Sequence, residues 1–168
     1  TAGGPEKAAI CRELGADLAI DYLEEDFVEK VLEATGGEGA DVIYDPVGGA
    51  VFEQSRKCVA WHGRILVIGF AGGEMGNAPM NQLLLGNYSL VGVYMGEYSH
   101  RDRPFLDRVH AELLGLYAEG RIKPLIHGVV PLEAVPGAIA GLAGRATAGK
   151  VVVQVAGEAE SPDSPSRK

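Results

Sequence analysis

Glycine-rich turns at the ends of apolar runs are the most informative feature of this sequence. Three such turns occur, at Asp45-Pro-Val-Gly-Gly49, Ile68-Gly-Phe-Ala-Gly-Gly73 and Tyr94-Met-Gly96. Because glycine has no side chain, turns of this kind let a flat ligand lie directly against the backbone. Each glycine alone could simply close a turn, but three turns at one edge of a sheet favour a nucleotide-binding site.

The side chains that usually perform nucleophilic, acid-base or metal chemistry do not form a recognisable arrangement. No Cys-x-x-Cys or His-Glu-x-x-His pair occurs, and no serine lies in a Gly-x-Ser-x-Gly turn. The acidic run Glu24-Glu25-Asp26 is typical of a solvated helix N-terminus, where negative charge complements the helix dipole. We therefore predict no catalytic residue and no metal ligand here. The histidines, which share no ligand spacing, are His62, His100, His110 and His127.

Apolar periodicity predicts alternating strands and helices. Apolar runs bounded by turn residues indicate strands, and apolar residues three or four positions apart indicate helices. The run 64–68 is typical of a strand buried on both faces of a parallel sheet. Pro136 is compatible with the last helix because it would lie in the first turn. The predicted strands are 17–22, 41–45, 64–68, 89–95 and 150–155; the predicted helices are 7–14, 24–34, 51–61, 81–85, 103–119 and one beginning near Leu132.

This alternation predicts an α/β fold with a doubly wound parallel sheet of Rossmann type. Such sheets bind ligands outside the carboxyl ends of their strands, where the three glycine-rich turns would lie. We expect residues 1–122 to form part of a dinucleotide-binding domain and residues 123–155 to form a C-terminal segment. The polar tail 156–168 has nothing to bury, so we expect it to be disordered.

Composition excludes several classes of function. The 168 residues include 23 acidic and 15 basic side chains, for a formal net charge of −8, and the basic residues are scattered singly, which argues against nucleic-acid binding. No apolar run approaches the roughly 20 residues of a membrane helix, and the first residues lack a signal-peptide pattern. Cys11 and Cys58 lie far apart inside apolar patterns. We therefore expect no membrane segment, no disulfide framework and a cytoplasmic location.

From Thr1 to about Val155 the chain resembles the zinc-independent quinone oxidoreductase branch of the medium-chain dehydrogenase/reductase superfamily, the relatives of zeta-crystallin. The resemblance is supported by the order and spacing of several short segments taken together. These segments are Thr1–Lys7, Leu14–Asp17, Ile20–Tyr22, Asp41–Gly48, Gly63–Gly69, Gly120–Pro124 and Gly149–Val152.

The resemblance implies an NADPH-dependent oxidoreductase that transfers hydride to a quinone or a conjugated carbonyl and forms a homodimer. It also implies that this chain is the C-terminal half of a longer protein and is inactive alone. A GroES-like catalytic domain and the strand and helix of the G-x-G-x-x-G fingerprint would precede Thr1. The sheet would then be incomplete at its N-terminal side, and residues 123–155 would pack on the catalytic domain. The alternative is a truncated, catalytically silent module that binds nucleotide weakly or mediates oligomerisation.

The resemblance assigns cofactor contacts to individual residues. Gly3 and Lys7 match the segment that faces the adenosine ribose and its 2′-phosphate. Because Lys7 offers a cation and no carboxylate precedes Glu6, NADP(H) rather than NAD(H) is implied. Lys7 as an ordinary helix lysine is the alternative. Tyr22 would lie beside the adenine and Val47 near the adenosine ribose. The nicotinamide contacts would come from Gly69, Phe70 and Ala71, and from the strand end Val93, Tyr94 and Met95.

Overall fold

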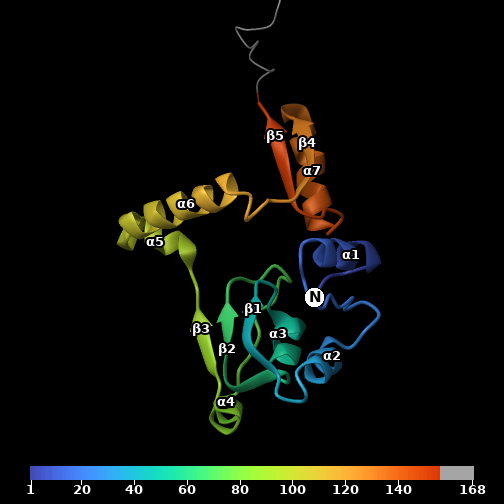
Figure 1. The fold of residues 1–168 in the computed structure, drawn as a ribbon, viewed down its shortest axis with the longest axis vertical. Helices are drawn as coiled ribbons and strands as arrows, with labels where there is room; N and C mark the ends of the chain where they lie inside the picture. Colours follow the sequence, from blue (N-terminus) through green and yellow to red (C-terminus); the bar gives the residue numbers. More distant parts are fainter. Residues whose placement is uncertain (156–168) are drawn as a thin grey trace, which may run out of the picture. The chain divides into compact units, whose positions relative to one another are not determined.

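The computed structural model describes residues 1–155 and contains two compact units. Residues 1–106 form the first unit and the residues from 107 onward form the second, so the division falls within helix α6 (Arg103–Ala118). Figure 1 shows the elements of both units. The predicted tail 156–168 lies outside the described residues. The boundary expected between residues 122 and 123 concerns a longer protein and stays a prediction.

A three-stranded parallel sheet is the centre of the first unit (Figure 1). Its order is β1 (Ala40–Asp45), β2 (Val59–Val67) and β3 (Ser89–Gly92), and all pairs are parallel. Helix α3 (Gly49–Ser55) connects β1 to β2, and helix α4 (Met80–Gly86) connects β2 to β3. This strand-helix alternation confirms the predicted α/β fold with a parallel sheet.

Two apolar clusters hold the helices on this sheet. The first surrounds Ile65, which is 0% exposed at the centre of β2, and the second surrounds Phe27 at the start of α2 (Phe27–Ala34). Ile43 of β1 packs against both clusters, so the first strand joins them. The buried members are Phe52, Ile65 and Tyr88 in the first cluster and Ile20, Phe27 and Cys58 in the second.

Local signals explain where the first two helices begin. Helix α1 (Pro5–Glu13) has proline at its first position, where the fixed φ of the ring suits a helix and the missing N–H is not needed. Asp26 caps α2, because its Oδ1 accepts hydrogen bonds from the backbone N of Val28 at 2.9 Å and of Glu29 at 3.5 Å. The helix N-terminus predicted at the acidic run Glu24-Glu25-Asp26 is confirmed.

The strand predicted over 17–22 is wrong except at one point. Asp21 forms an isolated parallel bridge with Ala2, where Ala2 N donates to Ile20 O at 2.9 Å and Tyr22 N donates to Ala2 O at 3.1 Å. A strand needs a partner of comparable length. Among residues 1–155 only Ala2 pairs with this segment, so the ladder ends after one bridge.

The helix predicted over 51–61 ends early, because α3 stops at Ser55 and β2 begins at Val59. Ala40 pairs with Val59 but Val42 pairs with Arg64, so β2 contains an irregularity with extra residues between these two pairs. Gly63, which follows the predicted helix, lies inside β2. The apolar residues of the helix and of the first part of β2 together have a helical spacing. This spacing made the predicted helix too long.

The third strand is shorter than the predicted range 89–95. It ends at Gly92, and a 3-10 helix η1 (Met95–Glu97) and the short helix α5 (Tyr98–Arg101) follow. Val93 N still donates to Val67 O at 3.0 Å, which extends the pairing by one residue. Met95 therefore lies in η1 rather than in the strand.

The second unit contains a strand that the sequence analysis did not predict. Strand β4 (Ile126–Pro131) pairs in parallel with the predicted strand β5 (Lys150–Gln154). The 3-10 helix η2 (Leu132–Ala134) and helix α7 (Val135–Ala143) follow β4, and Pro136 lies in the first turn as predicted. His127, Gly128 and Pro131 interrupt the apolar pattern of β4, which explains the omission. In the described part of the chain, no helix has the length and apolar character needed to cross a bilayer.

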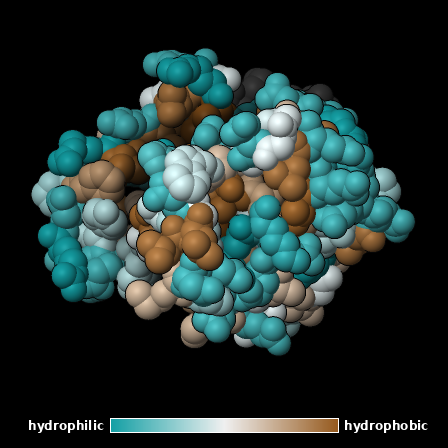
Figure 2. All heavy atoms as spheres, turned by 90° about the horizontal axis from the view of Figure 1, so that it is seen from below, coloured by the Kyte–Doolittle hydropathy of each residue, from teal (hydrophilic) through white to brown (hydrophobic). Residues whose placement is uncertain are grey.

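Apolar side chains remain exposed along β1 and α4. Val42 and Tyr44, on one face of β1, are 45% and 66% exposed. Helix α4 also exposes Met80, Leu84 and Leu85. Figure 2 shows patches of apolar side chains among hydrophilic ones on the face seen from below. β1 is an outer strand of the three-stranded sheet, and no described residue forms a strand on its other side. β1 is therefore an open edge.

We predict that the 168-residue chain by itself associates through this open edge. Its thermal unfolding, followed by circular dichroism, should be broad or should shift with protein concentration, because an unpaired apolar strand pairs with other chains. Sedimentation should detect the associated species. A sharp, reversible transition that does not depend on concentration would contradict this prediction.

Candidate functional site

The carboxyl ends of the three strands in the first unit lie side by side. Their last residues are aligned, because Asp45 pairs with Val67 and Val67 pairs with Gly92. The turn after β1, the loop 68–79 after β2 and the segment after β3 therefore leave the sheet at one edge (Figure 1). This is the edge at which doubly wound sheets bind ligands.

Backbone pairing continues beyond β1 and β2 into the segments that follow them. Ile68 N donates to Asp45 O at 3.0 Å, Ala71 N donates to Pro46 O at 2.9 Å, and Gly72 N donates to Val47 O at 2.9 Å. The turn and the loop are thus joined by hydrogen bonds of ordinary ladder length. Together with the alignment of β3, this pairing brings Val47, Gly69, Phe70, Ala71 and Val93 to one edge.

Gly48 allows the loop to close on the turn. Its φ is 74°, a value that side chains other than glycine rarely adopt. A Cβ at this position would lie 2.6 Å from Glu74 O and 2.8 Å from Phe70 Cδ1. Both the backbone conformation and the close approach of Phe70 therefore require glycine here.

Gly69 and Gly92 leave their backbone accessible. A Cβ on Gly69 would meet only Pro46 O, at 3.6 Å, and a Cβ on Gly92 would meet nothing within 4 Å. Packing therefore does not demand glycine at either position. The open space beside the two strand ends fits the approach of a flat cofactor ring to the backbone. Phe70, Tyr94 and Met95 are exposed around this edge and add apolar and aromatic surface.

Three of the residues predicted to contact the adenosine end, Gly3, Lys7 and Tyr22, lie near the start of α1. The ring of Tyr22 lies against Gly3, because a Cβ on Gly3 would be 2.7 Å from the Tyr22 hydroxyl oxygen. Asp21 fixes this arrangement, since its Oδ1 accepts from Gly4 N at 2.8 Å and from Leu23 N at 3.1 Å. Lys7 is half-buried in the first turn of the same helix.

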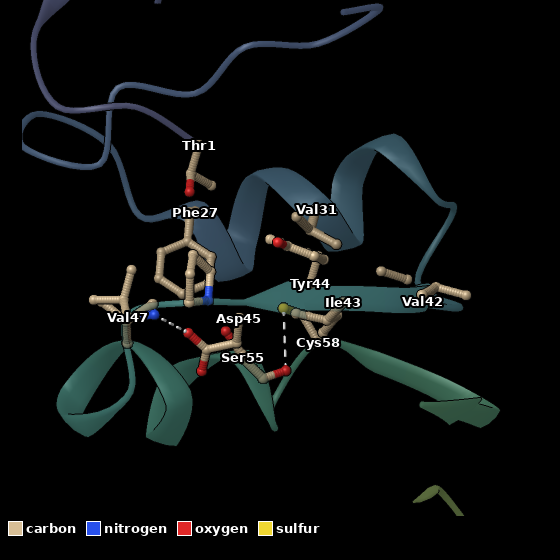
Figure 3. Close-up of a pocket in the computed structure, with 13 residues that line it drawn as sticks. Thr1, Phe27, Val31, Val42, Ile43, Tyr44, Asp45, Val47, Ser55 and Cys58 are labelled. Carbon is tan, nitrogen blue, oxygen red and sulfur yellow. Dashed lines mark hydrogen bonds between the residues drawn. The ribbon is translucent and has the colours of Figure 1, made fainter. Parts of the chain in front are cut away.

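A pocket of about 400 Å³ lies between the N-terminal segment and β1 (Figure 3). Thr1 and Val47 both line it, so the start of the chain and the turn after β1 face the same space. Phe27 and Val31 of α2 and the residues of β1 form its apolar walls. Of the predicted adenosine contacts, Val47 borders this hollow, whereas Gly3, Lys7 and Tyr22 do not line it.

Cys58 lines this pocket but is not a nucleophile. Burial raises the pKa of its thiol, and the carboxylate of Asp26 raises that pKa further. The thiol stays protonated at neutral pH, and its Sγ donates to Ser55 O at 3.5 Å (Figure 3). Cys11 is half-buried and Cys58 is buried, and both are free thiols.

The described residues do not fit a zinc ion. Between residues 1 and 155, no group of three or more histidine, cysteine, aspartate or glutamate side chains is placed to hold a metal ion. A protein zinc site needs at least three such ligands. The four histidines of the chain are all exposed.

The sequence analysis did not single out two buried carboxylates, Asp21 and Asp45. Each stands at the end of an extended segment and accepts hydrogen bonds from two backbone N–H groups. A signal was present for the turn role of Asp45, because aspartate directly before proline is typical of a turn that the side chain stabilises. Asp21 has no such neighbour in the sequence.

Comparison with known proteins places the chain among dehydrogenases. A family described as zinc-binding dehydrogenase matches residues 1–111. A quinone oxidoreductase-like protein 2 homolog from Nematostella vectensis is 42% identical over 149 residues, which cover 88% of this chain and 41% of the relative.

Two solved structures are also similar. The Escherichia coli quinone oxidoreductase complexed with NADPH has a TM-score of 0.81 at 29% identity, covering 90% of this chain and 47% of that one. An NAD-dependent alcohol dehydrogenase has a TM-score of 0.78 at 34% identity, covering 92% and 43%. The chain thus spans less than half the length of these proteins.

Proposed function

The chain belongs to the zinc-binding dehydrogenase family and resembles its quinone oxidoreductase members, and from this premise we propose that it is the cofactor-binding half of an NADPH-dependent oxidoreductase. The main support is the convergence of three strand ends with accessible backbone at Gly69 and Gly92. The NADPH in the complexed Escherichia coli relative supports the choice of cofactor.

In this proposal the site has a nicotinamide end and an adenosine end. Gly69, Phe70 and Ala71 hold one side of the nicotinamide and its ribose, and Val93, Tyr94 and Met95 meet the carboxamide. Gly3 and Lys7 face the ribose and the 2′-phosphate. Tyr22 lies beside the adenine, and Val47 lies near the adenosine ribose.

The chain's own part in the reaction is positioning. When bound, the reduced nicotinamide supplies the hydride, and protein groups determine where its ring lies. Small errors in that position are costly, since a shift of about 1 Å can lower a rate about 100-fold. We extend the proposal to the intact protein as a metal-independent, cytoplasmic homodimer. Its substrate would be a quinone, as the names of these relatives suggest, or a conjugated carbonyl, as the family resemblance of the sequence implies.

Replacing Lys7 tests the choice between NADPH and NADH. Loss of a charge-assisted hydrogen bond to the 2′-phosphate should cost about 1.5–3 kcal/mol. In the intact protein, Lys7→Ala should therefore weaken NADPH binding by about 10- to 100-fold and leave NADH binding unchanged. Titration calorimetry with both nucleotides measures the effect. Lys57→Ala is the control, because this exposed lysine precedes β2 and lies far from the strand carboxyl ends.

An equal loss of NADH and NADPH affinity in Lys7→Ala would mean that the lysine has only a structural role. If the intact wild-type protein bound neither nucleotide, the alternative of a catalytically silent module would replace the proposed function.

Replacing Gly69 tests whether this half acts through positioning. Valine adds a branched side chain where the backbone is accessible, and the nearest atom to its Cβ would be at an ordinary contact distance. Gly69→Val should therefore lower turnover of a small quinone with NADPH by about 100-fold without a comparable loss of thermal stability. Alanine at each of the four histidines should have much less effect, and a strong chelator should have none.

Chelator-sensitive activity would contradict metal independence. A folded histidine variant that loses more activity than Gly69→Val would contradict the positioning mechanism.

A further inference from the structure

We propose that Asp45 is a positioning residue for the hydride-transfer step, because its carboxylate fixes the loop that holds the nicotinamide. This inference rests on the proposed function. Asp45 is the last residue of β1 and is 4% exposed. Its side chain acts on the proposed site through hydrogen bonds to the backbone of the turn that follows β1.

The carboxylate holds two consecutive backbone N–H groups. Its Oδ1 accepts from Val47 N at 2.8 Å and from Gly48 N at 3.0 Å, and Figure 3 shows the first of these bonds. An aspartate that bonds to backbone groups two and three residues further along fixes the conformation of a turn. Because the acceptor is a carboxylate, such bonds are stronger than those between neutral groups.

The same two peptide units hold the loop from their other side. Val47 N shares a peptide unit with the carbonyl of Pro46, which accepts from Ala71 N at 2.9 Å. Gly48 N shares a peptide unit with the carbonyl of Val47, which accepts from Gly72 N at 2.9 Å. A peptide unit is planar, so fixing its N–H fixes the direction of its C=O.

Asp45 therefore determines where the nicotinamide loop lies, through two planar peptide units. The N–H of each unit donates to the Asp45 carboxylate, and the C=O of each unit accepts from a backbone N–H of the loop. Ala71 and Gly72 directly follow Gly69 and Phe70, so a rotation of either peptide unit would displace the proposed nicotinamide contacts. The close approach of Phe70 to Gly48 provides a second connection between the turn and the loop.

Three variants of the intact protein separate this role from a general loss of stability. Asp45→Ala removes the acceptor of the buried Gly48 N–H and of the half-buried Val47 N–H. Asp45→Asn keeps one carbonyl oxygen that can accept both bonds. Asp41→Ala removes an exposed aspartate from the same strand and is the matched control.

Hydrogen exchange of the peptide covering residues 69–72 measures the coupling without any substrate. Asp45→Ala should exchange there about 10-fold faster or more than the wild type, because the loop amides lose fixed acceptors. Asp45→Asn and Asp41→Ala should exchange like the wild type.

Steady-state kinetics with NADPH and a small quinone measure the consequence. The kcat of Asp45→Ala should fall about 100-fold while its KM for NADPH changes by no more than about threefold, because the proposed adenosine contacts of Gly3, Lys7 and Tyr22 do not depend on the Asp45 carboxylate. Asp45→Asn should recover most of that kcat. A residue that only stabilises the fold would not produce a lower kcat at a nearly unchanged KM, nor would the asparagine variant then restore kcat.

Two results would overturn the inference. One is wild-type exchange at 69–72 in Asp45→Ala, whatever the activity. The other is an active wild-type protein in which Asp45→Ala matches Asp41→Ala in kcat. Absence of NADPH-dependent reduction by the wild type would instead overturn the proposed function, and the exchange measurement would still decide whether Asp45 fixes the loop.

Discussion

The candidate site depends on the parallel pairing of β1 with β2, which does not stop where the two strands end. The carbonyls of Asp45, Pro46 and Val47 accept in turn from Ile68, Ala71 and Gly72. This extension turns two loops into a continuation of the sheet edge. Loops usually vary more than the elements they connect, but these two have defined backbone partners. A site made of backbone groups can be specific only if the loops that carry those groups are held in one conformation.

The rest of the first unit keeps this edge in place. Ile65 is completely buried at the centre of the sheet, and Ile43 connects its cluster to the one around Phe27. Packing thus fixes β1 and β2 relative to α2 and α3, and the pairing transmits that position to the loops. At the N-terminal side, Asp21 fixes the start of α1 as Asp45 fixes the turn after β1. Two buried carboxylates therefore perform the same task at both ends of the proposed cofactor site.

The sequence predicted the parts that depend on local chemistry. The buried run 64–68, the Asp26 cap and the glycine-rich turns at the sheet edge all follow from residue type and spacing. Prediction from the sequence failed where pairing with a distant segment decides whether a strand forms. Residues 17–22 have strand composition but only one partner residue, and β4 becomes a strand despite its glycine and proline because β5 pairs with it. The connection of Asp45 to the loop after β2 was not visible either, since it depends on hydrogen bonds between residues far apart in the sequence, such as the one from Ala71 N to Pro46 O.

We propose that the three strand ends and the start of α1 form one NADPH site. Hydrogen exchange of the intact protein with and without saturating NADPH is the most direct test of this arrangement. We expect slower exchange in peptides that cover residues 1–7, 45–49, 69–72 and 93–96, and unchanged exchange in α4. Protection confined to other segments, or no protection at a concentration of NADPH that supports turnover, would contradict it.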